Sequence, residues 1–164
     1  MVILMNGAPG TGKTTVSALL HEAWKCPWFE FGWIPEFRHL NPHTQITYEE
    51  EEQLSFENLM LVTRNYLRHG YAKVLISDLR PEMVLEAADA LCDCDVRIIT
   101  LYADEQTIRH RVRTRNNGNT YRDEDAAVKI NAQILSASPR ACEMRMDTGC
   151  ISPEEVARRI CESL

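Results

Sequence analysis

A glycine-rich stretch near the N-terminus is the feature that most restricts how this chain of 164 residues can fold. Residues 7–14 read Gly-Ala-Pro-Gly-Thr-Gly-Lys-Thr and match the pattern GxxxxGK[ST]. An apolar run at residues 2–5 precedes the stretch, and a segment of helical period follows it at residues 13–24. A glycine loop between a buried strand and a helix predicts a backbone cradle for phosphate groups.

The residue types in this loop suit a nucleoside triphosphate. Glycines let the backbone curl and bring its N–H groups close to the phosphates. Lys13 is predicted to reach the β- and γ-phosphates, and Thr14 to offer its hydroxyl to Mg²⁺. A glycine turn that merely joins strand to helix is the alternative, but it requires neither residue at these offsets. The residues predicted to bind ATP here are Gly7, Ala8, Pro9, Gly10, Thr11, Gly12, Lys13, Thr14 and Thr15.

Apolar runs suited to buried strands alternate with segments of helical period along the whole chain. The expected strands cover residues 2–5, 28–31, 73–77, 96–102 and 143–146, and the expected helices cover residues 13–24, 49–68, 82–91, 105–114, 123–136 and 153–162. Continuous runs of Val, Ile and Leu are typical of strands buried on both faces. The sequence therefore predicts an α/β fold with about five parallel strands between layers of helices.

Two helix starts carry the sequence signature of a capping box. Thr47 with Glu50 and Ser152 with Glu155 have the required spacing. Residues 49–52 are four glutamates, which we interpret as a solvated first turn favoured by the helix dipole.

Length and charge limit the classes of function. A chain of this length fits one domain, so we expect residues 1–164 to form a single domain. The net charge of −6 argues against a nucleic-acid partner. No stretch suits a membrane span or a secretion signal, and the six cysteines have no metal-ligand spacing, so we expect a cytoplasmic protein with reduced thiols.

Four further stretches, together with the glycine loop, resemble the nucleoside-monophosphate-kinase-like branch of P-loop proteins, which includes adenylate kinase, shikimate kinase and chloramphenicol phosphotransferase. They cover residues 77–81, 109–115, 147–149 and 152–156. The resemblance therefore extends over nearly the whole chain. It implies a three-layer P-loop NTPase fold and a kinase that uses ATP and Mg²⁺. The loop also occurs in large ring-forming ATPases with paired acidic residues at a strand end, but here Leu79 follows Asp78 and no extra helical domain fits.

Phosphoryl transfer requires positive charge that can close over the γ-phosphate. In the helix expected at residues 105–114, Ile108 and Val112 mark the buried stripe. Arg111 and Arg115 share one flank of that stripe, whereas Arg113 points most nearly to solvent. We therefore predict Arg111 and Arg115 as catalytic, ATP-binding residues, with a solubilising helix face as the alternative.

Arginines of this kind begin a mobile lid in the resembling kinases. The polar stretch at residues 116–122 resembles a short lid, which we place near residues 113–124. Arg122 is a further candidate to complete it.

Asp78 follows a predicted buried strand, at the sheet edge where α/β proteins bind ligands. A carboxylate there can hold metal-bound water or accept a proton from an acceptor hydroxyl. We therefore predict Asp78 as a catalytic residue and, with Thr14, as a Mg²⁺ site. A carboxylate that merely ends the strand is the alternative. Arg80 is a candidate to clamp an anionic acceptor or to lie at the surface.

The segment after the second strand is where the resembling kinases build their acceptor site. Here it is aromatic, and Trp28, Phe29 and Phe31 are expected mainly in the core. Shikimate kinase and chloramphenicol phosphotransferase have an acidic residue soon after this strand, whereas the nearest positions here are Trp33 and Ile34. Glu36 is the candidate substitute, so the base is left open between Asp78 and Glu36. His39 and His43 straddle a proline and are not expected to form a metal pair.

Together these features predict an ATP-dependent kinase that moves the γ-phosphoryl group to a small-molecule or nucleotide acceptor with Mg²⁺. A nucleoside triphosphatase or nucleotide-dependent switch is the alternative from another class. A nucleotide-binding module without catalysis is a third. No Asn-Lys-x-Asp stretch is present, which argues against a GTPase.

Overall fold

Five parallel strands form the centre of the computed structural model, which describes residues 1–33, 46–116 and 120–164. The strands are β1 (Val2–Gly7), β2 (Trp28–Glu30), β3 (Val74–Ser77), β4 (Val96–Tyr102) and β5 (Glu143–Asp147). The helices are α1 (Lys13–Trp24), α2 (Tyr48–Arg68), α3 (Pro81–Ala90), α4 (Glu105–Thr114), α5 (Glu124–Ser136) and α6 (Pro153–Ser163), with a 3₁₀ turn η1 at Phe31–Trp33. The sheet order is β2-β3-β1-β4-β5, which confirms the predicted α/β fold.

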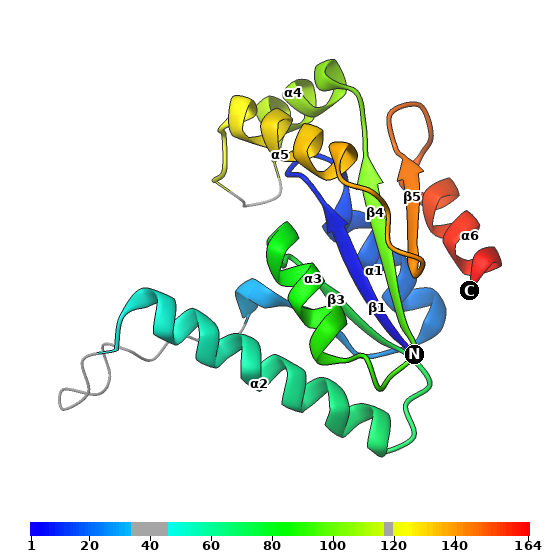
Figure 1. Cartoon of the computed structure of the whole chain (residues 1–164). Helices are drawn as coiled ribbons and strands as arrows, with labels where there is room; N and C mark the ends of the chain where they lie inside the picture. The colour runs from blue at the N-terminus through cyan, green and yellow to red at the C-terminus, as the bar shows by residue number, and fades with distance from the viewer. Residues whose placement is uncertain (34–45, 117–119) are drawn as a thin grey trace.

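The central strand β1 is buried on both faces, because successive side chains of a strand point to opposite sides. Ile3 and Met5 pack with α1 and α6, and Val2 and Leu4 pack on the other face with α2 and α3. Figure 1 shows the resulting layers, with all strand arrows running in one direction. A parallel sheet needs such cover on both sides, and this explains the continuous apolar run at the start of the chain.

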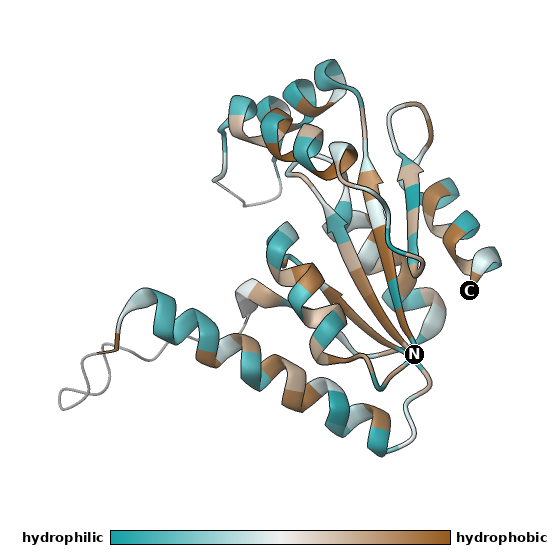
Figure 2. Ribbon diagram, in the orientation of Figure 1, coloured by the Kyte–Doolittle hydropathy of each residue, from teal (hydrophilic) through white to brown (hydrophobic). Residues whose placement is uncertain are grey.

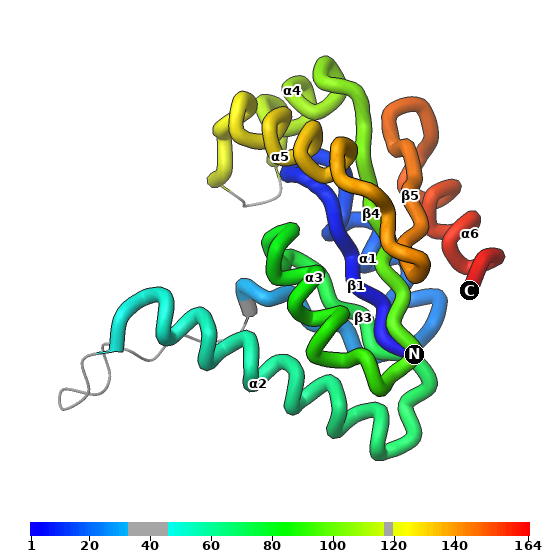
Figure 3. Tube along the Cα trace, in the orientation of Figure 1, coloured from blue at the N-terminus to red at the C-terminus, as the bar shows by residue number. Residues whose placement is uncertain are grey.

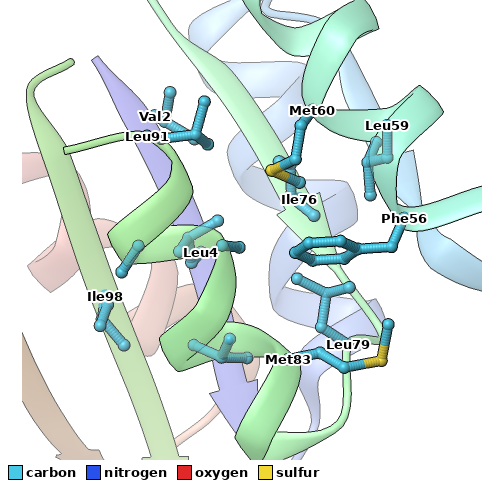
Figure 4. Packing of buried hydrophobic residues seen from close by; sticks show 13 residues of the cluster. Val2, Leu4, Phe56, Leu59, Met60, Ile76, Leu79, Met83, Leu91 and Ile98 are labelled. Atoms are coloured by element: carbon cyan, nitrogen blue, oxygen red, sulfur yellow. The ribbon is translucent and has the colours of Figure 1, made fainter. Parts of the chain in front are cut away.

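The larger apolar cluster lies between the sheet and the helices α2 and α3. Phe56, Leu59 and Met60 of α2 meet Ile76 of β3 and Met83 of α3, as Figure 4 shows. Hydrophobic residues line the sheet, whereas the outer surface of α2 carries many hydrophilic ones (Figure 2). The helix is thus amphipathic, as its sequence period predicts.

Helices α4 and α5 form a smaller unit at the carboxyl ends of the strands. They lie side by side in the Cα trace of Figure 3. Ile108 and Val112 of α4 pack with Ala127 of α5 and Ala103, which follows β4. The buried stripe predicted for residues 105–114 is confirmed, and its residues Ile108 and Val112 lie next to Gly10 of the glycine loop.

One of the two predicted capping boxes is confirmed. Thr47 Oγ1 accepts the Glu50 N–H at 3.2 Å, and Glu50 accepts the Thr47 N–H at 2.8 Å. At α6, Ser152 accepts the Glu155 N–H at 3.3 Å, but the carboxylate of Glu155 binds Arg158 and Arg159 instead of the cap. That half of the prediction is wrong, because two arginines one turn along the helix compete for the same carboxylate.

The expectation that residues 49–52 form a solvated turn is wrong at Glu51, which is only 5% exposed. Its neighbour Glu52 pairs with Arg80 at 2.6 Å. The acidic turn therefore faces the loop before α3 as well as solvent. No helix in the described part of the chain is long and apolar enough to span a membrane, and all six cysteines are unpaired.

Burial along α2 predicts a sharp contrast between two leucines that are two residues apart. Leu59 is fully buried and Leu61 is 62% exposed. Leu59→Ala should lower the free energy of unfolding by about 2–5 kcal/mol, whereas Leu61→Ala, the matched control, should change it by less than about 0.5 kcal/mol. Urea denaturation of the three proteins measures both values. Equal effects would contradict the packing of α2 on the sheet.

A candidate phosphate-binding site

The glycine loop joins β1 to α1 through backbone conformations that require glycine. Gly7 has φ 141° and Gly10 has φ 88°. A Cβ atom on Gly7 would lie 2.4 Å from the Leu101 carbonyl oxygen, and one on Gly10 would lie 3.0 Å from Val112 Cγ2. The loop therefore curls against the end of β4 and against α4. The Leu101 carbonyl leaves no room for a larger residue at Gly7, and the positive φ of Gly10 would strain one there.

Hydrogen bonds within the loop close it on itself. Thr11 is fully buried, and its hydroxyl donates to the Ala8 carbonyl at 2.8 Å. The ammonium of Lys13 donates to the carbonyls of Gly7 at 2.7 Å and Ala8 at 3.1 Å. Lys13 thus rests inside the curl of the loop, at the start of α1.

Burial lowers the pKa of Lys13 from 10.5 to about 8. The charge of Arg115 lowers this pKa further, and the carboxylates of Asp78 and Glu30 oppose the change. The two carboxylates therefore offset only part of the cost of burying the ammonium. An anion placed beside Lys13 would offset more of that cost, as expected of a phosphate site.

Asp78 lies directly after β3 with a left-handed backbone, φ 66°. Such a φ is uncommon outside glycine, although Asp tolerates it better than most residues. Its side chain is exposed and borders the same cavity as Thr14. Backbone strain of this kind clusters at functional sites. The hydroxyl of Thr14 and the carboxylate of Asp78 are oxygen ligands of the kind that Mg²⁺ prefers.

The three arginines of the α4 region differ as the helical period predicts. Arg111 donates to the Thr148 hydroxyl at 3.0 Å and to its carbonyl at 2.6 Å, whereas Arg113 is exposed and pairs with Glu124. Helix α4 ends one residue before Arg115, which is its C-cap residue with φ −53° and ψ 130°. Arg111 and Arg115 nevertheless border the same cavity.

One cavity of about 650 Å³ brings most of the predicted residues together. The lining residues that the sequence predicts are Pro9, Gly10, Thr11, Gly12, Lys13, Thr14, Thr15, Asp78, Arg111 and Arg115. Gly7 and Ala8, at the start of the loop, are buried and do not line the cavity. The volume lies within the range of small-molecule sites.

Several residues that sequence reasoning did not assign also belong to this region. The cavity is also lined by Thr148, Ile151, Pro153 and Val156, which lie after β5 and in α6. Glu30, the last residue of β2, is close enough for its charge to act on Lys13. The sequence places Glu30 only within the second strand, and its position near Lys13 follows from the pairing of that strand's end with the end of β3. In the sequence, residues 147–149 and 152–156 carry the family resemblance but indicate no role at the site.

The remaining sequence predictions concern Arg80, the aromatic residues after the second strand, and the segments near residues 34–43 and 117–119. Arg80, a candidate either to clamp an acceptor or to lie at the surface, precedes α3 and pairs with Glu52 at 2.6 Å and with Glu82 at 3.2 Å. The expected core role of Phe29 and Phe31 is confirmed, since both pack against the cluster under α2. Ile34, Glu36, His39 and His43, and residues 117–119 of the predicted lid, lie outside the described residues.

Comparison with known proteins identifies the fold. A family model described as an AAA domain matches residues 3–131, and no curated protein sequence matches the chain. A sugar kinase from Janibacter sp. HTCC2649 has a TM-score of 0.69 and 17% identity, over 98% of this chain and 92% of that one. A shikimate kinase from Bacteroides thetaiotaomicron has a TM-score of 0.68 and 14% identity, over 99% and 97%. A gluconokinase from Sinorhizobium meliloti 1021 has a TM-score of 0.64 and 17% identity, over 99% and 94%. The kinase-like fold that the sequence predicts is therefore confirmed.

The lowered pKa of Lys13 predicts a pH-dependent stability. At pH 7 both the folded and the unfolded chain carry this charge, and only the folded chain bears the cost of burying it. As the pH rises from about 8 towards 10.5, the folded state loses the proton first and its stability increases. The stability gap between Lys13→Met and wild type should therefore shift by roughly 2 kcal/mol in favour of wild type between pH 7 and pH 10.

Denaturant unfolding of the two proteins at both pH values measures this shift. Lys129→Met, at an exposed position of α5, is the matched control and should show no such change. A pH-independent gap for Lys13→Met would mean that Lys13 has an ordinary pKa.

Proposed function

We propose that this chain, which belongs to the AAA domain family, is an ATP-dependent small-molecule kinase. The observation that carries the proposal is the single cavity that Lys13, Asp78, Arg111 and Arg115 share. The glycine loop supplies N–H groups and a helix N-terminus for a phosphate chain. Kinases of similar fold over almost the whole length of the chain support this choice.

The residues of the loop bind and orient the phosphate chain in this proposal. Lys13 neutralises the β- and γ-phosphates, and burial of its ammonium strengthens that interaction. Mg²⁺, held by Thr14 and Asp78, would neutralise further negative charge on the phosphates. Arg111 and Arg115 face the same cavity and stabilise the charge that develops as the phosphoryl group moves.

Transfer replaces one phosphorus–oxygen bond by another. The bond between the γ-phosphorus and the oxygen bridging to the β-phosphate breaks, and a bond forms to the hydroxyl oxygen of the acceptor. The hydroxyl proton leaves to a carboxylate or to water. Asp78 is the candidate base among the residues that line the cavity, and Glu36 stays a candidate from the sequence.

A nucleoside triphosphatase or a nucleotide-dependent switch would use the same loop. Two observations favour the kinase. Leu79, which is 4% exposed, follows Asp78 in the chain, so the end of β3 lacks the paired acidic residues found in the ring-forming ATPases. The similar kinases also match this chain from end to end, with no additional domain required.

Removal of the Lys13 charge tests the active site directly. Lys13→Ala should lower acceptor-stimulated ADP release by about 10³-fold or more and weaken ATP binding, because it deletes the one loop cation on the phosphates. The assay is a screen of metabolites and nucleosides for stimulated ADP formation. Lys129→Ala is the control and should match wild type. ADP release that no acceptor stimulates would favour the triphosphatase, and unchanged turnover in Lys13→Ala would remove the site.

The arginines provide a second test, based on their different surroundings. Arg111→Ala and Arg115→Ala should each lower the turnover rate by about tenfold or more, because both face the cavity. Arg113→Ala should stay within about twofold of wild type, since its side chain is 70% exposed. Steady-state rates of the three variants decide the matter. Equal losses in all three would contradict the assignment.

A further inference from the structure

A row of buried hydrogen bonds crosses the sheet beneath the glycine loop. Asn6 of β1 donates from Nδ2 to Thr100 Oγ1 of β4 at 3.1 Å. Thr100 in turn donates to Glu143 Oε1 of β5 at 2.7 Å. Asn6 is 7% exposed, Thr100 is fully buried, and the Glu143 side chain is 7% exposed. Buried polar groups are costly unless they are fully paired, so this row requires an explanation.

The carboxylate of Glu143 sets the direction of every bond in the row. An ionised carboxylate only accepts, so the single hydroxyl proton of Thr100 points to Glu143. Thr100 must then accept from Asn6, which turns the amide nitrogen of Asn6 towards β4. The amide oxygen is left facing the N–H of Gly7, which donates to it at 2.9 Å. The opposite amide orientation would put two donors face to face.

Glu143 stays ionised because of its partners. Burial alone would raise its pKa, but hydrogen bonds from Arg145 and Thr100 bring the pKa below its ordinary value. Arg145 donates to Glu143 at 2.8 Å and to the Ala137 carbonyl, at the end of α5, at 2.8 Å. The row is therefore anchored at the far edge of the sheet by an arginine that also caps a helix.

At its β1 end the row restrains Gly7, through the side chain of Asn6. The N–H of Gly7 is held by Asn6, and its carbonyl accepts the ammonium of Lys13 at 2.7 Å. Its φ of 141° is available only to glycine, and the Leu101 carbonyl oxygen leaves no room beside it. Both peptide groups of Gly7 are thus restrained, one by the row and one by Lys13.

We propose that Asn6, Thr100 and Glu143 are positioning residues for phosphate binding. They hold Gly7 in the orientation that lets its carbonyl receive Lys13, and so keep the ammonium in place for a phosphate chain. None of the three lines the cavity. This inference rests on the proposed function, since it requires that the loop bind ATP.

The test compares two substitutions of Thr100 with a control substitution of another buried threonine. Thr100→Val keeps the shape but removes the donor and acceptor, whereas Thr100→Ser keeps the hydroxyl. Thr63→Val is the matched control, because Thr63 is fully buried on α2 and its hydroxyl has no hydrogen-bond partner among the described residues. Affinity for ATP with Mg²⁺ is measured by calorimetry, together with the melting temperature.

Thr100→Val removes the hydroxyl and both of its hydrogen bonds, and it should bind ATP roughly five- to tenfold more weakly. Thr100→Ser and Thr63→Val should stay within about twofold of wild type. A Thr100→Val protein that melts at a lower temperature yet binds ATP as wild type does would make the row purely structural and overturn the proposal.

A second variant distinguishes a connected row from independent contacts. Asn6→Ala should weaken ATP binding at least as much as Thr100→Val, and the double variant should lose no more than Asn6→Ala alone. Additive losses would overturn the proposal. If Thr100→Val does not fold, Asn6→Ala decides, and wild-type affinity in that variant overturns the inference. Failure of the wild-type protein to bind ATP would instead overturn the proposed function.

Discussion

The pairing of β1 with a strand on each side is the constraint on which the rest of the structure depends. Because β3 and β4 run parallel to β1, the carboxyl ends of all three strands meet at one edge of the sheet. That edge places Asp78 on one side of the glycine loop and Leu101 on the other. Asp78 brings a carboxylate to one side of the loop, and Leu101 provides the backbone surface against which Gly7 turns. Cover by helices on both faces makes this pairing stable in water.

The arrangement of charge at this edge lowers the stability of the folded protein. Lys13 carries a buried ammonium whose pKa is lowered, and Arg115 adds to the positive charge. Asp78 keeps a strained backbone, φ 66°. Each feature lowers the stability of the folded chain, and in the proposed function an anion beside Lys13 would offset the first of them. Such opposition between stability and function is expected where a site must be ready for a highly charged ligand.

Most of the fold could be predicted from the sequence, because apolar period and glycine pattern act locally. The helices at residues 13–24 and 105–114 begin and end where predicted. Glu51 and Glu155 could not be placed, since their fates depend on burial and on competing arginines. Glu30 was missed because its role depends on the register between β2 and β3, which no local pattern encodes. The row from Asn6 to Glu143 joins residues 94 and 43 positions apart, so only the folded sheet reveals it.

The contact between the loop and α4 has a consequence for how related chains can diverge. Gly10 has so little space that an added Cβ would lie 3.0 Å from Val112 Cγ2 and 3.2 Å from the Ile108 carbonyl oxygen. Val112 is fully buried and does not line the cavity. A bulkier residue at position 112 would nevertheless push the loop out of shape, and a smaller one would remove the wall on which it rests. Selection for a working loop therefore extends to the volume of a side chain that no ligand touches.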